Sequence, residues 1–81
     1  MINKQGLVYQ IKVRGYLDKR WSDWFAGMTI TTMCAEDGLV VTELTGKIVD
    51  QSSLRGQLCK LWDLNYTLIS VNQIEERREK E

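Results

Sequence analysis

The chain has 81 residues, of which 43% are hydrophobic and 27% are charged, and this composition is typical of one small globular domain. Eleven Lys and Arg residues balance eleven Asp and Glu residues, so no net charge attracts a nucleic acid. The apolar runs are too short for a membrane span or a signal peptide. The sequence therefore predicts a cytoplasmic protein with neither a nucleic acid nor a membrane as partner.

The first predicted elements are a strand and a short helix. Polar and apolar residues alternate from Leu7 to Leu17, which predicts a half-buried strand. Asp18 can cap a helix over Lys19 to Ala26, and Gly27 can adopt the left-handed conformation that ends it. We expect this helix to be short for a connection between two strands.

A hairpin follows the short helix. The segments Met28 to Cys34 and Leu39 to Thr45 are rich in β-branched residues, as strands are. Asp37-Gly38 lies between them, and Asp-Gly favours the tight turn of a β-hairpin. The two segments are therefore predicted to be antiparallel neighbours.

The second helix has the clearest pattern in the chain. Asp50 can cap it, and Asn65 is a plausible left-handed stop. Between them an apolar stripe at helical spacing is formed by Leu54, Leu58, Leu61 and Trp62. A last strand is predicted from Thr67 to Val71, but alternation does not decide which of its sides faces inward.

These elements give the fold class and the domain limits. We expect residues 1–74 to form one α+β domain, and residues 75–81 to be a charged tail that is disordered or a frayed helix. The order β-α-β-β-α-β predicts a ferredoxin-like arrangement, in which two helices cover one face of a four-stranded antiparallel sheet. The residues predicted to fill its core include Trp21, Trp24, Phe25, Trp62, Cys34 and Cys59.

The chain resembles a family of small uncharacterised prokaryotic proteins. The resemblance rests on a GxLDxRWxxWFxGxTIT pattern from Gly15 to Thr31 and a GxxxDQxxLxGxL pattern from Gly46 to Leu58. In such sequences a Pro often follows the glycine that corresponds to Gly46, and a Gly often ends the second helix. This chain has Lys47 and Asn65 at these two positions. The resemblance implies a shared fold and brings no activity with it.

The absence of histidine restricts the chemistry that is open to this protein. It removes Ser-His and Cys-His nucleophiles and the commonest metal ligand. We predict no catalytic residue, no cofactor and no metal site, so an enzyme is the less favoured interpretation. Asp18 and Asp50 stand where caps are needed, and this explains them without catalysis.

Two groups of residues are candidates for binding. Near the first turn, a ligand pocket could be formed by Arg14, Asp18, Arg20 and Trp24, although a surface salt bridge is the favoured explanation of the charged members. On the sheet face away from the helices, a self-association surface is predicted around Lys12, Tyr16, Met33, Leu39 and Val41. The favoured hypothesis is a binding or assembly module that forms a homodimer through this face. The alternative is a small ligand-binding protein or enzyme of the dimeric α/β-barrel type, with a pocket between the helices and the sheet.

Overall fold

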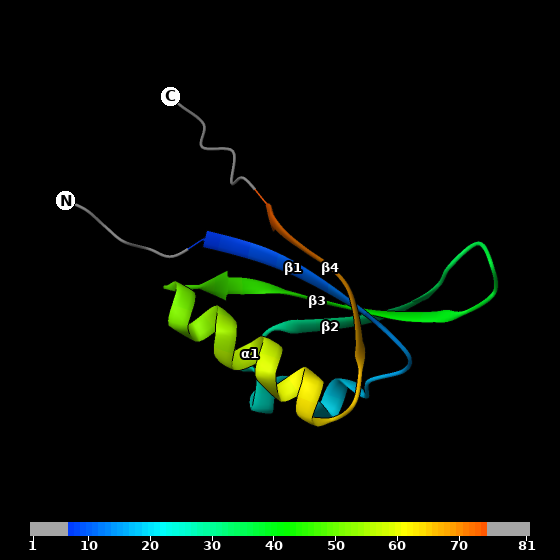
Figure 1. The fold of residues 1–81 in the computed structure, drawn as a ribbon, viewed down its shortest axis with the longest axis horizontal. Coiled ribbons are helices and arrows are strands. Elements are labelled where there is room, and N and C mark those ends of the chain that lie inside the picture. The colour runs from blue at the N-terminus through cyan, green and yellow to red at the C-terminus, as the bar shows by residue number, and fades with distance from the viewer. Residues whose placement is uncertain (1–6, 75–81) are drawn as a thin grey trace.

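The computed structural model describes residues 7–74, so the predicted charged tail at 75–81 lies outside the described residues. Along the chain the elements are β1 (Leu7–Arg14), η1 (Lys19–Phe25), β2 (Thr29–Cys34), β3 (Val40–Ile48), α1 (Gln51–Asp63) and β4 (Thr67–Ile74). The strands form one sheet in the order β2-β3-β1-β4, and each neighbouring pair is antiparallel. Figure 1 shows α1 and η1 on the same side of this sheet.

The prediction of an α+β domain with a four-stranded antiparallel sheet and two helices is confirmed. The ferredoxin-like order β-α-β-β-α-β is corrected at its first helix, because η1 is a 3₁₀-helix. Only seven residues lie between the Asp18 cap and Ala26, which already has a left-handed φ of 56°. A segment this short forms 3₁₀ turns more readily than a stable α-helix.

The signals at the ends of the elements are confirmed. The Asp50 carboxylate accepts a hydrogen bond of 2.8 Å from the Ser53 backbone N–H at the start of α1. Asn65 follows α1 with a left-handed φ of 69°. In the β2–β3 hairpin, Gly38 has a φ of 85° and its N–H donates to the Ala35 carbonyl.

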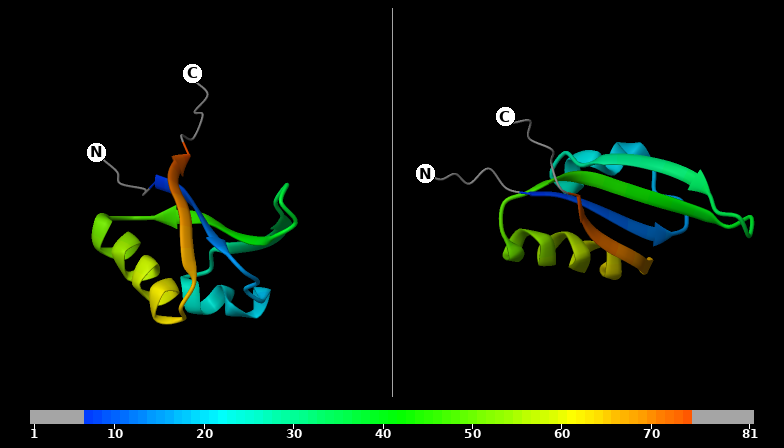
Figure 2. Two further views of the ribbon diagram at one scale, coloured as in Figure 1. Left: turned by 45° about the vertical axis from the view of Figure 1, so that its right-hand side comes forward. Right: turned by 90° about the horizontal axis from the view of Figure 1, so that it is seen from above.

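The core lies between the sheet and the two helices. Its most deeply buried members come from every layer and include Ile11, Val13, Phe25, Leu44 and Leu61. On α1 the buried residues follow the spacing of an amphipathic helix, with Leu54 and Leu61 seven residues apart. The helix contacts β3 and β4 and lies on one side of the sheet (Figure 2).

The prediction that the three tryptophans fill this core is wrong. Trp21, Trp24 and Trp62 are 39%, 52% and 51% exposed, whereas Phe25 is fully buried. In a 3₁₀-helix, side chains three residues apart lie on one side, so Trp21 and Trp24 share the solvent side of η1. Their rings meet edge to face, with centroids 6.3 Å apart.

The two cysteines were also predicted to be core residues, and this prediction is wrong. Cys34, at the end of β2, and Cys59, on α1, are both exposed free thiols. On α1 the inward positions next to Cys59 are occupied by Leu58 and Leu61, so Cys59 points outward.

A bulge in β4 settles which side of the last strand faces inward. Lys12 pairs with Ser70, but Val13 pairs with Leu68, so Ile69 is an extra residue without a partner on β1. Strict alternation would have placed Leu68 and Val71 on opposite faces. With the bulge, both pack against the core, and Ile69 is 43% exposed.

Candidate functional site

The sheet face that points away from α1 and η1, here called the outer face, is the first candidate for a binding surface. Cross-strand partners share a face, so the register assigns its central residues. On the outer face lie Gln10, Lys12 and Arg14 of β1, Thr29, Thr31 and Met33 of β2, Val41, Glu43 and Thr45 of β3, and Ser70 and Asn72 of β4.

The outer face contains a hollow of about 310 Å³ near the hairpin end of the sheet. It is lined by Lys12, Arg14, Met33, Ala35, Val41 and Ile69. Figures 1 and 2 show the β2–β3 hairpin extending past the other strands and curling away from α1, which makes this end of the outer face concave. Apart from the two basic side chains, the lining is apolar.

The β4 bulge and the strand register together build this hollow. Val41 lies directly between Arg14 of β1 and Met33 of β2, and these neighbours leave only 7% of it exposed. Val41 was predicted to belong to the self-association surface, and it forms part of the floor of the hollow. Ile69 reaches the hollow because the bulge removes it from the inward-facing series.

The predicted self-association residues are partly brought together. Lys12, Met33 and Val41 line the hollow. Leu39 is 45% exposed in the hairpin turn, where its carbonyl accepts a hydrogen bond from the Ala35 N–H. Tyr16 lies beyond the end of β1 and is 61% exposed, while its backbone carbonyl accepts a hydrogen bond from the Tyr66 hydroxyl.

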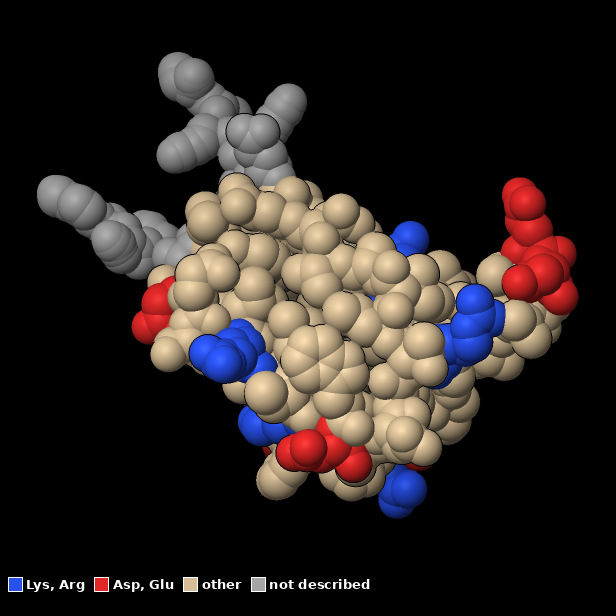
Figure 3. Space-filling view, viewed as in Figure 1, with Lys and Arg blue, Asp and Glu red and all other residues tan. Residues whose placement is uncertain are grey.

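The hairpin tip next to the hollow carries the opposite charge. Glu36 and Asp37 are exposed at this turn, and the Asp37 carboxylate accepts a hydrogen bond of 3.0 Å from the Leu39 N–H. Figure 3 shows acidic side chains gathered at the hairpin end, with basic side chains nearby on the body of the domain. The outer face therefore combines a basic hollow with an acidic, projecting tip.

The four residues of the predicted ligand pocket do not form one site. Asp18 caps η1 and pairs with Arg20 at 3.3 Å, and the Arg20 side chain is 86% exposed. Arg14 lines the outer hollow, whereas Trp24 belongs to η1 under the opposite face. The Lys60 amine donates to the Trp24 carbonyl at 2.7 Å and lies 5.0 Å from the Trp24 ring centroid, so Trp24 is engaged with α1.

Sequence reasoning missed one polar residue inside the apolar stripe of α1. Gln57 is 8% exposed, and among the described residues its Oε1 atom has no hydrogen-bond partner. It lies three residues after Leu54 and four before Leu61, which are both core residues. That position within the stripe was the available signal, because a leucine is the residue expected there.

Neither a membrane span nor a metal centre is found in the part of the chain that the structure describes. No helix within residues 7–74 has the length and apolar character needed to cross a bilayer. Within the same residues no group of three or more His, Cys, Asp and Glu side chains could hold a metal ion.

A family model described as a domain of unknown function, DUF8691, matches residues 8–72. The comparisons with curated proteins and with solved structures gave no match. The resemblance to a family without a known function is confirmed at this level, while the motif pattern and the prokaryotic origin stay predictions.

Proposed function

The chain belongs to the DUF8691 family, whose description assigns no function, and we propose that this member is a non-catalytic assembly module that forms a homodimer through the outer face of its sheet. The observation that carries the proposal is the hollow lined by Lys12, Arg14, Met33, Val41 and Ile69 beside an acidic hairpin tip. A two-fold dimer needs one surface that complements itself.

Charge provides that complementarity. Lys12 and Arg14 border the hollow, and Glu36 and Asp37 project from the hairpin tip of the same chain. Across a two-fold axis, the tip of each copy would meet the basic border of the other, so that this contact forms twice. The net charge of zero adds no overall repulsion between the two copies.

The apolar part of the proposed contact is provided by the same residues. Leu39 is 45% exposed next to the acidic tip, and Ile69 and Met33 are incompletely covered in the hollow. Burying them in a partner would remove apolar surface from water, at roughly 25 cal/mol for each Å². We propose that Leu39 of one copy enters the hollow of the other.

The experiment is a charge reversal followed by a second reversal that restores complementarity. Sedimentation velocity of the wild-type protein should show a dimer at high micromolar concentration. Glu36→Lys and Arg14→Glu should each weaken the dimer by about tenfold or more, and the double variant should regain most of the loss. Lys19→Glu, an exposed position on η1, is the matched control and should leave the dimer unchanged.

Two outcomes would contradict this function. A monomeric wild-type protein at every concentration would remove the dimer. A dimer that weakens with both single variants, but is weaker still in the double variant, would show that the two charges do not meet.

We also propose that the protein is cytoplasmic. Cys34 and Cys59 are exposed free thiols, and the cytosol keeps such thiols reduced. Reduced thiols would leave the dimer to form through non-covalent contacts at the outer face.

A further inference from the structure

A second hollow, here called the cavity, lies on the helix side of the sheet, where α1, β3 and the turn from η1 to β2 meet. Its volume is about 230 Å³, and it is lined by Ala26, Met28, Lys47, Ile48, Val49, Ser53 and Gln57. The register explains its position, because β2 begins at Thr29 opposite Thr45. The last residues of β3 therefore have no β2 neighbour, and the space beside them stays open.

Gln57 is the unusual member of this lining. It is 8% exposed on the sheet-facing side of α1, yet its Oε1 atom has no hydrogen-bond partner among the described residues. Leaving a buried acceptor unpartnered costs about 1–3 kcal/mol of stability. A leucine at this position would avoid that cost, so the amide lowers the stability of the fold.

The walls around Gln57 are held in place by hydrogen bonds. The Ser22 hydroxyl donates to the Met28 carbonyl at 2.8 Å, and the Gly27 N–H donates to the Ser22 carbonyl at the same distance. On the opposite wall, the Ser53 N–H donates to the Asp50 carboxylate. These hydrogen bonds hold the backbone of both walls, and a preformed site lowers the entropic cost of binding.

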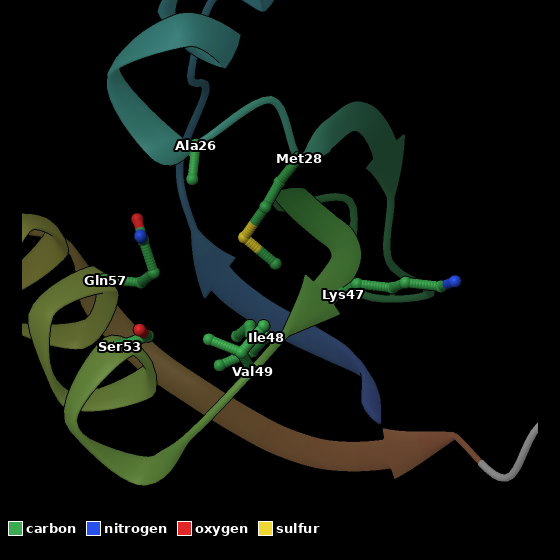
Figure 4. A pocket seen from close by; sticks show the side chains of 7 residues that line it. All are labelled: Ala26, Met28, Lys47, Ile48, Val49, Ser53 and Gln57. Carbon is green, nitrogen blue, oxygen red and sulfur yellow. The ribbon is translucent and has the colours of Figure 1, made fainter. Parts of the chain in front are cut away.

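The lining selects the chemistry of a ligand. Ala26, Met28, Ile48 and Val49 offer apolar surface. Figure 4 shows the Gln57 amide on the helix side of the cavity, directed toward Ala26, while the Lys47 amine runs away from it. No charged group of this lining points inward, so the cavity suits a neutral molecule.

We infer that this cavity is a binding site for a small, neutral, mainly apolar molecule that donates one N–H or O–H hydrogen bond to Gln57 Oε1. An apolar cavity of about 150 Å³ is large enough to take up benzene. The volume of about 230 Å³ therefore suits a bicyclic ring. This site shares no residue with the outer hollow, so the inference does not depend on the proposed dimer.

The test uses three probes of nearly the same shape: indole, which has an N–H donor, benzofuran, which has an acceptor in its place, and indene, which has neither. Each is titrated into ¹⁵N-labelled protein and followed by two-dimensional NMR. Indole should shift the amide signals of Ala26, Met28 and Val49 and the side-chain amide of Gln57. It should bind about tenfold more tightly than indene, as one net hydrogen bond predicts.

Substitution of the amide is the second arm of the test. In Gln57→Met, which keeps the length of the side chain, indole and indene should bind with equal affinity, and Gln57→Leu provides the same comparison in a branched side chain. Gln73→Leu, at an exposed position on β4, is the control and should keep the preference for indole. Equal binding of indole and indene to the wild-type protein, or no shift with any probe, would overturn the inference.

Discussion

The Thr42 hydroxyl should contribute more to the free energy of unfolding than any other polar side-chain group in the described core. Thr42 is fully buried on β3, and its Oγ1 accepts a hydrogen bond of 3.1 Å from the Leu17 N–H. The same hydroxyl donates to the Gly15 carbonyl at 2.6 Å. Gly15 has a φ of 111°, which favours glycine, and its N–H donates to the Val40 carbonyl at 2.8 Å. The Thr42 hydroxyl therefore partners two of the remaining backbone groups of this turn.

The substitution Thr42→Val keeps the shape of the side chain and removes both hydrogen bonds. Each buried group left without a partner costs about 1–3 kcal/mol, and the Gly15 carbonyl is partly exposed, so we expect a loss of about 2–4 kcal/mol. For a domain of this size each kcal/mol lowers Tm by about 4–8 °C, so Tm should fall by at least about 8 °C.

Urea unfolding followed by circular dichroism measures this loss directly. The control is Thr32→Val, because Thr32 lies opposite Thr42 on β2 but is exposed. We expect the control to change the free energy of unfolding by no more than about 0.5 kcal/mol. A Thr42→Val protein as stable as the control would refute the view that this hydroxyl holds the turn after β1.

Three further predictions concern the helix and the end of β3. Gly56→Ala should stabilise the protein by about 0.5–1 kcal/mol in urea unfolding, because a Cβ there meets open space and alanine favours a helix. Gly46→Ala should destabilise it by about 1–3 kcal/mol, because the new Cβ would lie 3.0 Å from Met28 Cγ; a neutral result would mean that Met28 moves freely. The hydrogen bond from the Ser53 N–H lowers the pKa of Asp50 below its ordinary value of 3.8. The ionised carboxylate therefore stabilises the fold above pH 3.8, and this stabilisation is lost as the pH falls through the lower folded-state pKa. The stability difference between wild type and Asp50→Asn should therefore shrink in acid, and a difference independent of pH would contradict this.

The sequence predicted those features that depend on chemistry within a few residues. Asp50, Asn65 and the Asp37-Gly38 turn each act through neighbouring backbone groups, and each is found where it was expected. The pairing of the two hairpin strands follows from that turn. The burial of Leu54 and Leu61 likewise follows from helical spacing alone.

Features that depend on the type of helix or on a strand irregularity were not predictable in this way. Trp21 and Trp24 were assigned to the core on the assumption of an α-helix, and the change to three residues per turn placed both on the solvent side. Ile69 could not be assigned because no residue signals the bulge in β4. The burial of Val41 depends on Arg14 and Met33, which lie on two other strands.

Both proposed sites depend on the register of β3, which carries Val41 on the outer face at its start and Ile48 on the helix side at its end. A slip of one residue would exchange the two faces and remove the hollow and the cavity together. Gly46 opposes such a slip, because the place where its Cβ would stand is 3.0 Å from Met28 Cγ and 3.3 Å from Met28 Cα. A slip would bring the side chain of Thr45 or Lys47 to this point. The glycine therefore fixes the register on which both surfaces depend, although it lies outside the outer hollow and outside the lining of the cavity.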